Sequence, residues 1–293
     1  MSSQSSITNY ARVLHHFEST RALEVLTLQA SPILGILLSG FSLGKCGVIQ
    51  PGLLLLGSLA LTAHVFVFND WTGHVSDLRD PRRVTLVFDG GGLDRRHVAR
   101  VAVALLILAN VAFAAIGSRA MLLGAGIAAL SLLYSGSPNF GKTMPIAASF
   151  NHLLGGSLHF LLGYTLCHAL DARGVWISLF FGLVFAAGHL NQEVRDYEGD
   201  LLNEIRTSAV VFGCRRIFLA SLCIFTAAYA IVVTLAALGI LPRLLLWSVV
   251  VWLLHVAWSL QALRRGLGFE TAIWMQRRYR LLFAFIGMAM LAR

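Results

Sequence analysis

Ten of the fourteen acidic residues fall in two short windows of the chain. The first window holds Asp70, Asp77, Asp80, Asp89 and Asp94, and the second holds Glu193, Asp196, Glu198, Asp200 and Glu204. If the windows are helical, several of these carboxylates share a helix face, because they recur at intervals of three, four or seven residues. Like charges at such spacings repel, so facing carboxylates favour a bound cation. Oxygen ligands without His or Cys pairs indicate a hard cation, and Mg²⁺ is the ion we expect.

Either window alone is equally well explained as a solvated network of salt bridges at a helix end. Two windows with helical spacing and flanking arginines favour a functional interpretation. Mg²⁺ held by carboxylates bridges phosphate oxygens, and cationic side chains neutralise the remaining charge of a diphosphate. We therefore predict a site that binds a diphosphate.

The segments that must position these windows are strongly apolar. Of the 293 residues 57% are hydrophobic and only 13% are charged, against roughly 25% charged in soluble domains. This composition excludes the soluble classes. A membrane span needs about 20 apolar residues, and nine segments satisfy this length: 22–43, 48–68, 97–117, 120–136, 145–168, 174–192, 215–239, 241–262 and 272–292. Continuous apolar runs exclude alternating barrel strands, and backbone groups in lipid must be satisfied internally, so we expect helices.

The basic residues divide unequally between the two sides that nine helices define. Eighteen of the 23 Lys and Arg residues lie on the side of the N-terminus, which predicts a cytoplasmic N-terminus and an external C-terminus. Topology and anionic lipid therefore account for the net charge of +9 without a nucleic-acid partner. We predict an all-α integral protein of the inner or plasma membrane. It has a polar segment, 1–20, and one nine-helix bundle, 21–293, whose active-site cavity faces the cytoplasm.

The four cysteines form no C-x-x-C pair and lie in or beside apolar runs. Their spacing fits neither a disulfide framework nor a zinc site, so they are expected to be small packing residues.

Two motifs in the acidic windows resemble those of the UbiA superfamily of intramembrane prenyltransferases. That family has nine transmembrane helices, with N-D-x-x-D-x-x-x-D after the second and D-x-x-x-D after the sixth. The first motif reads Asn69-Asp70-Trp71-Thr72-Gly73-His74-Val75-Ser76-Asp77, and the second reads Asp196-Tyr197-Glu198-Gly199-Asp200. Gly73 replaces the middle aspartate of the first motif, so one expected metal contact is missing.

The resemblance implies a Mg²⁺-dependent prenyltransferase that moves a prenyl group from an isoprenyl diphosphate to an aromatic or quinone-precursor acceptor in the membrane. The metal ligands that it implies are Asn69, Asp70, Asp77, Asp196 and Asp200, and the four aspartates are the expected catalytic residues. Lys142 matches the position of a basic diphosphate-binding residue in the family. Further candidates for binding the diphosphate, or for anchoring to lipid headgroups instead, are Arg82, Arg83, Arg195 and Arg206.

An allylic cation needs aromatic faces and the exclusion of water. The expected substrate pocket therefore includes Trp71, Tyr134 and Tyr197, for which core packing is the alternative. Histidines inside membrane segments are costly and usually face a cavity, so the pocket also includes His64, His152 and His189. Each histidine can instead form a hydrogen bond between helices. His64 and His189 are equally able to position an acceptor hydroxyl or to act as a base.

Two other functions remain as alternatives. A UbiA-type terpene cyclase would quench the cation within its own prenyl chain. A transporter of anionic lipids or metabolites is less favoured, because the acidic residues gather at one surface and the sequence shows no internal repeat.

Overall fold

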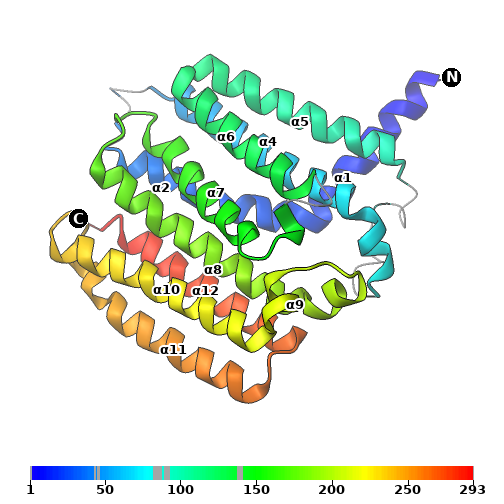
Figure 1. Cartoon of the computed structure of the whole chain (residues 1–293). Helices are drawn as coiled ribbons and strands as arrows, with labels where there is room; N and C mark the ends of the chain where they lie inside the picture. The colour runs from blue at the N-terminus through cyan, green and yellow to red at the C-terminus, as the bar shows by residue number, and fades with distance from the viewer. Residues whose placement is uncertain are drawn as a thin grey trace.

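The long helices of this protein lie side by side in one bundle (Figure 1). The computed structural model describes residues 2–42, 44, 47–81, 88, 93–136 and 141–292, and those residues contain no strand. The long helices are α1 (Ser2–Leu28), α2 (Ala30–Leu38), α4 (Ile49–Arg79), α5 (Arg95–Ile116), α6 (Ser118–Ser135), α7 (Ala147–Tyr164), α8 (Ala172–Leu202), α10 (Cys214–Ala237), α11 (Ser248–Arg265) and α12 (Phe269–Ala289). The short elements are α9 (Ser208–Phe212) and the 3₁₀ turns η3 (Gly141–Thr143) and η4 (Arg243–Trp247).

Seven helical segments of the described chain are long and apolar enough to cross a membrane. They are Asn9–Leu38, Ile49–Arg79, Arg95–Ile116, Ser118–Ser135, Ala172–Leu202, Cys214–Ala237 and Arg243–Arg265. Each of the nine expected segments contains a helix, but α7 and α12 are not among the seven. Polar residues such as Asn151 and His152 make α7 less apolar, and Arg277 and Arg278 add charge to α12.

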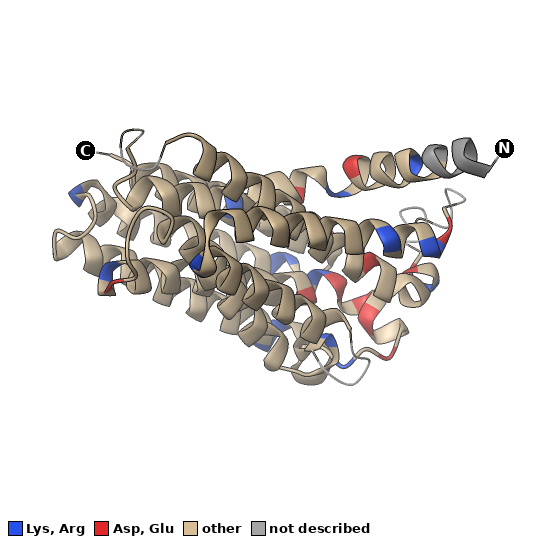
Figure 2. Cartoon of the chain, turned by 90° about the horizontal axis from the view of Figure 1, so that it is seen from above, with Lys and Arg blue, Asp and Glu red and all other residues tan. Residues whose placement is uncertain are grey.

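The two acidic windows lie on helices that are longer than the membrane is thick. α4 and α8 each have 31 residues, or about 46 Å at 1.5 Å per residue, whereas the hydrocarbon layer is about 30 Å thick. Both motifs occupy the last third of their helix. Figure 2 shows most acidic residues at one end of the bundle, where the N-terminus lies, with the C-terminus at the opposite end.

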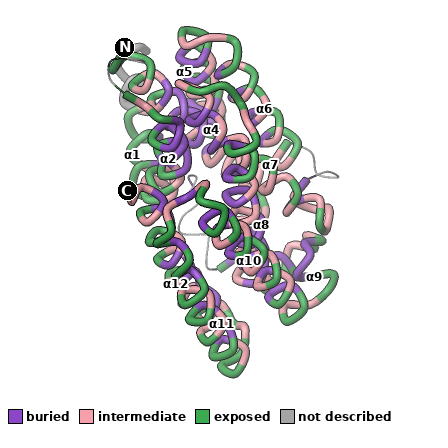
Figure 3. The backbone as a smooth tube through the Cα atoms, turned by 90° about the vertical axis from the view of Figure 1, so that its left-hand side faces the viewer, coloured by how far each residue is buried: buried purple, intermediate pink, exposed green. Residues whose placement is uncertain are grey.

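α8 is the most buried of the seven candidate spans, whereas α11 lies at the edge of the bundle (Figure 3). α8 packs against α7 and α10, and α4 packs against α5. α2 and α7 approach each other closely at Gly163, where a Cβ would lie within van der Waals overlap of the Pro32 carbonyl oxygen. Small residues permit such contacts between membrane helices.

The N-terminal residues are part of this bundle. α1 runs without a break across residue 20, where the polar segment was expected to end, and the side chains of Val13 and Phe17 are buried against α4 and α5. The division into 1–20 and 21–293 therefore stays a prediction of the sequence alone.

The expectation for the cysteines was wrong at one position. Cys167, which follows α7, is disulfide-bonded, whereas Cys214 and Cys223 are free thiols. The spacing of the cysteines along the chain did not indicate this bond.

Candidate functional site

Both acidic windows meet in one small pocket at the charged end of the bundle, which we call the acidic pocket. Its lining residues are Ser76, Asp77 and Asp80 at the end of α4, Lys142 in η3, and Asp196, Gly199, Asp200, Asn203 and Ile205 at the end of α8 and just beyond. Its volume is about 10 Å³, which is room for roughly one water-sized particle. An ion fits this space, but a diphosphate requires the lining side chains to move.

Helical periodicity explains which residues line the acidic pocket. Asp77 and Asp80 are three residues apart at the end of α4, and Asp196 and Asp200 are four residues apart on α8, so each pair faces one way. The two helix ends approach closely at Gly199, where a Cβ would lie within van der Waals overlap of the Asp80 carboxylate. A side chain at residue 199 would therefore push the two acidic windows apart.

The guanidinium of Arg195 covers one side of Asp196. Its Nε donates to Oδ1 of Asp196 at 2.7 Å and its Nη2 donates to Oδ2 at 2.8 Å, while Nη1 reaches Oε1 of Gln276 on α12 at 3.2 Å. Arg195 is thus beside the acidic pocket, next to a proposed metal ligand.

Asn69 and Asp70 do not line the acidic pocket. They lie about two turns earlier on α4, where Asp70 accepts hydrogen bonds from Nε of Arg21 at 2.9 Å and from its Nη2 at 2.5 Å. The amide oxygen of Asn69 accepts from Oγ of Ser135 on α6 at 3.3 Å. The structure therefore separates the first motif into a deeper half, which binds α1 and α6, and an outer half, which faces α8.

The donors in the acidic pocket suit a hard divalent cation. The lining has four carboxylates, one amide and one hydroxyl against the single ammonium of Lys142, and oxygen donors of this kind are the ones Mg²⁺ prefers. Among the described residues, however, no three His, Cys, Asp or Glu side chains already converge as a ligand cage. Asp80 was not among the expected ligands, although its place three residues after Asp77 is the helical spacing that could have indicated it.

Gly73 leaves open space where the family motif has its middle aspartate. A Cβ added at Gly73 would lie 3.4 Å from Oδ2 of Asp77 and 3.9 Å from Oγ of Ser76, which is ordinary van der Waals contact. Close packing therefore does not require a glycine at this position, because a side chain would fit. The consequence of Gly73 is the loss of one carboxylate from the motif.

The expected substrate-pocket residues form two groups. Tyr134, His152 and His189 pack together: the two imidazole rings stack with centroids 3.9 Å apart, and the tyrosine ring meets each of them edge-on. Trp71 belongs to the second group, which stacks in the order His64, Phe68 and Trp71.

The remaining pocket candidates have contacts of a structural kind. Nδ1 of His64 donates to the carbonyl of Ala102 at 2.8 Å and so links α4 to α5. The guanidinium of Arg95 lies over the Trp71 ring, 4.8 Å from its centroid. Tyr197 packs against the core formed with α10 and α12.

The candidate diphosphate-binding residues are also spread unequally. Lys142 lines the acidic pocket, Arg195 lies beside it, and Arg206 is exposed in the loop after α8. Arg82 and Arg83 lie outside the residues that the structure describes.

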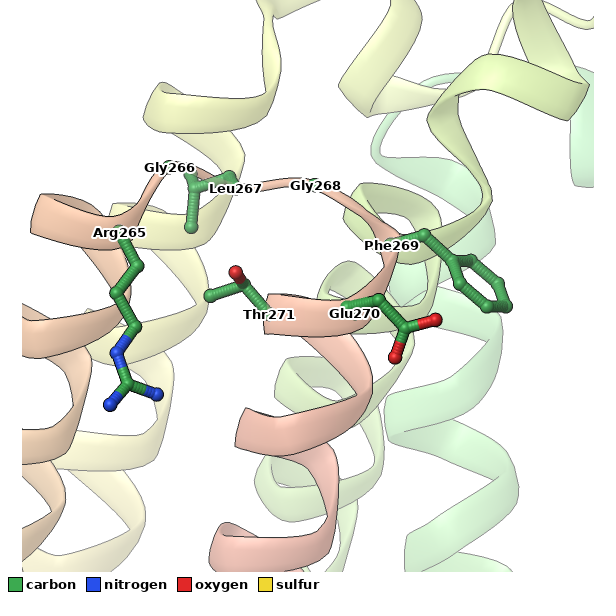
Figure 4. Close-up of a pocket in the computed structure, with 7 residues that line it drawn as sticks. All are labelled: Arg265, Gly266, Leu267, Gly268, Phe269, Glu270 and Thr271. Carbon is green, nitrogen blue, oxygen red and sulfur yellow. The ribbon is translucent and has the colours of Figure 1, made fainter.

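A larger hollow of about 420 Å³ opens at the surface between α11 and α12. Seven consecutive residues line it, from Arg265 to Thr271, and the side chains of Arg265 and Glu270 point away from each other (Figure 4). Since none of the predicted site residues lies there, the acidic pocket is the better candidate site.

Comparisons with known proteins agree on the fold. No curated protein matches the sequence. A solved UbiA homologue from Archaeoglobus fulgidus, bound to GPP and Mg²⁺, has a TM-score of 0.71 at 17% identity over 97% of this chain and 99% of that chain. An apo UbiA homologue from Aeropyrum pernix K1 has a TM-score of 0.69 at 16% identity over 90% and 96%. A structure of digeranylgeranylglyceryl phosphate synthase has a TM-score of 0.68 at 17% identity over 98% of each chain.

The sequence itself also matches a family model. The model describes the UbiA prenyltransferase family and covers residues 33–287, which include both acidic windows and nearly all of the helical bundle. The chain therefore belongs to the UbiA prenyltransferase family.

Proposed function

We propose that this protein transfers a prenyl group from an isoprenyl diphosphate to an aromatic or quinone-precursor acceptor, in a Mg²⁺-dependent reaction within the membrane. The observation that carries this proposal is the acidic pocket, in which the two motif windows face each other beside Lys142. The Archaeoglobus fulgidus homologue of the same fold, which is bound to GPP and Mg²⁺, supports the same substrate class.

Asp77, Asp196 and Asp200 are the proposed catalytic metal ligands that already share the acidic pocket, and Asp80 joins them. Asn69 and Asp70 complete the proposed ligand set. Asp70 can bind the metal only after its hydrogen bonds with Arg21 are broken. Bound Mg²⁺ supplies positive charge to the leaving diphosphate.

Lys142 and Arg195 are the proposed diphosphate-binding cations, with Arg206, Arg82 and Arg83 as further candidates. Binding requires the Arg195 guanidinium to turn from Asp196 toward the phosphate oxygens, because an arginine forms paired hydrogen bonds with either group. Trp71, Tyr134, Tyr197 and the pocket histidines are proposed to surround the prenyl chain and the acceptor and to exclude water from the allylic cation.

We propose that the protein crosses the inner or plasma membrane with nine helices. Its N-terminus then lies in the cytoplasm. The opposite positions of the two termini in Figure 1 suit an odd number of crossings. The disulfide at Cys167 supports the orientation, because α7 runs from the Lys142 turn toward the opposite end and disulfides persist in oxidising compartments. In this orientation the acidic pocket faces the cytoplasm, and anionic lipid contacts the basic side.

Product analysis tests the proposal. Membranes containing the protein are given geranyl, farnesyl or geranylgeranyl diphosphate with MgCl₂, with and without a panel of phenols and quinone precursors, and products are identified by mass spectrometry. We expect prenylated acceptors that disappear in Asp200→Asn and persist in Glu198→Gln. Glu198 is a matched control because it lies on the same helix but is exposed and does not line the acidic pocket.

The same assay separates the alternatives. A hydrocarbon or terpene alcohol formed without an added acceptor supports the cyclase, for which the loss of the aspartate at Gly73 is the one observation in its favour. If prenyl diphosphates are bound but never consumed, the transporter hypothesis replaces both enzymes.

A further inference from the structure

The face of α8 that lines the acidic pocket continues deeper into the membrane, where it carries a histidine and a glutamate. His189, Glu193, Asp196 and Asp200 follow one another at intervals of four, three and four residues, so they share a helix face. His189 lies seven residues before Asp196, about 10 Å deeper along the helix axis. A prenyl diphosphate held at Asp196 and Asp200 would extend its apolar chain in this direction.

His189 is held between an aromatic ring and a carboxylate. Its ring stacks on His152 with 3.9 Å between centroids and an interplanar angle of 6°. Its Nε2 lies 3.1 Å from Oε1 of Glu193, and the two side chains are 5% and 3% exposed. Nε2 is nevertheless not aligned for a hydrogen bond with any described group. The carboxylate of Glu193 therefore lies beside this nitrogen and fixes the position of the imidazole ring.

Glu193 is fixed by two other donors. The backbone N–H of Ala209 donates to its Oε2 at 3.1 Å, and Oγ of Ser208 donates to Oε1 at 3.4 Å. These contacts hold the Glu193 carboxylate in place beside His189.

The two stacked histidines differ in their other contacts. Nδ1 of His152 donates to the carbonyl of Ala148 at 2.8 Å and therefore carries a hydrogen. Two imidazolium rings stacked at 3.9 Å would repel strongly. Of the two rings, His189 is therefore the one that lies beside a carboxylate, whereas His152 is bonded to its own helix.

Both ends of the turn that carries Lys142 touch this cluster. The backbone of Gly141 packs so closely on Tyr134 that a Cβ at Gly141 would overlap with the Tyr134 backbone. At the other end, the N–H of Ile146 donates to Oγ of Ser208 at 3.2 Å, the same hydroxyl that donates to Glu193. The cluster is therefore joined through this segment to Lys142, which lines the acidic pocket.

We infer that His189, oriented by Glu193, accepts the proton that a phenolic acceptor loses on prenylation. In this step the C1–O bond of the prenyl diphosphate breaks and its electron pair leaves with the diphosphate. A ring carbon of the acceptor forms the new bond to C1, and the proton displaced from that carbon passes to His189. The inference rests on the proposed prenyl transfer and names the residue that takes up the proton released in that reaction.

The structure distinguishes His189 from His64, which the sequence left equivalent. Nδ1 of His64 is committed to the Ala102 carbonyl, and in the described part of the chain no carboxylate lies within ion-pair distance of its ring. His64 is therefore held to α5 and is not the proposed base.

The test compares His189→Phe with His255→Phe. His255 is a matched control because it is also buried among aromatic rings, including Phe225 and Tyr279, but lies on α11 and stacks on none of the rings around His189. Full-length proteins are assayed with the acceptor that gives product in the screen above. The dissociation constant of geranyl S-thiolodiphosphate, an unreactive analogue, is measured with MgCl₂ in parallel.

For His189→Phe we expect turnover to fall by roughly 10²- to 10⁴-fold, the usual contribution of a general base. The dissociation constant of the analogue should stay within about twofold of wild type, and His255→Phe should match wild type in both measurements. Glu193→Gln keeps an acceptor for the Ala209 N–H but loses the charge, so it should lower turnover by a smaller factor. In both variants more of the consumed diphosphate should end as the free prenol, because a ring adduct that keeps its proton releases the prenyl cation again and water captures it.

Wild-type turnover in His189→Phe would overturn the inference, as would equal losses of turnover and analogue binding, which indicate a structural role. If the wild-type protein binds the analogue but forms only cyclised products, the proposed transfer to an acceptor fails, and this inference fails with it. The first two outcomes leave prenyl transfer intact, so the two failures are distinguishable.

Discussion

Replacing Gly73 with aspartate restores the carboxylate that the first family motif has at this position, and we expect it to strengthen Mg²⁺ binding. The site has room: a Cβ at Gly73 lies 3.4 Å from Oδ2 of Asp77, and the next nearest side chain among the described residues, Ser76, is 3.9 Å away. The new carboxylate carbon is one bond of about 1.5 Å beyond that Cβ. The two carboxylates can therefore approach a common cation from neighbouring turns of α4.

The size of the effect follows from two opposing contributions. A charge-assisted contact contributes about 1.5–3 kcal/mol, or roughly 10- to 150-fold in affinity. Without metal, the same two carboxylates repel by at most about 4 kcal/mol at 4 Å and an effective dielectric constant of 20. Removing a glycine from a helix interior returns only a few tenths of a kcal/mol. Gly73→Asp should therefore be less stable than wild type without Mg²⁺ and more stable at saturating Mg²⁺.

Thermal unfolding and prenyl transfer, each followed across a Mg²⁺ titration, measure this effect. The Mg²⁺ concentration for half-maximal activity should fall at least about tenfold in Gly73→Asp. Gly73→Asn adds a similar volume without the charge and should leave it near the wild-type value. If Gly73→Asp and Gly73→Asn are both inactive at every Mg²⁺ concentration, the space beside Gly73 is needed for substrate and the reasoning from charge is refuted.

Three further predictions concern other parts of the chain. Arg21→Gln should destabilise the purified protein by roughly 1.5–3 kcal/mol, seen as a lower Tm, because the half-buried Asp70 loses its paired contact; an unchanged Tm would show that α1 docks without this ion pair. Asp171→Ala should cost about 0.5–2 kcal/mol at pH 7, because Asp171 caps α8 by accepting from the N–H of Gly174 at 2.7 Å. That hydrogen bond lowers the pKa of Asp171, so the stabilisation is complete above the unfolded pKa of about 3.9. It is lost as pH falls through the folded value, and the difference in Tm should vanish in that range; a difference that persists there would exclude the carboxylate as its source. Reporter fusions after Arg21 and at the C-terminus should report opposite sides of the membrane, and a shared side would contradict the nine-helix topology.

Some features of the site followed from the sequence because they depend on one helix at a time. Apolar runs of membrane length predicted the helical segments, and the intervals in Asp196–Asp200 placed these carboxylates on one face, since helical geometry is local. The family motifs were readable for the same reason: each lies within a single helix, so its spacing is preserved along the chain. The assignment of the chain to its family needed no tertiary information.

Contacts between helices were decided only by the tertiary structure. Asp70 and Asp77 are equivalent members of one motif in sequence, yet Asp70 binds Arg21 of α1 and only Asp77 reaches the acidic pocket. His64 and His189 both lie in membrane helices. In the folded bundle His64 bonds a backbone carbonyl, whereas His189 lies beside a carboxylate. Pairing across the bundle depends on which helix faces are buried together, and the interval between two residues along the chain carries no record of it.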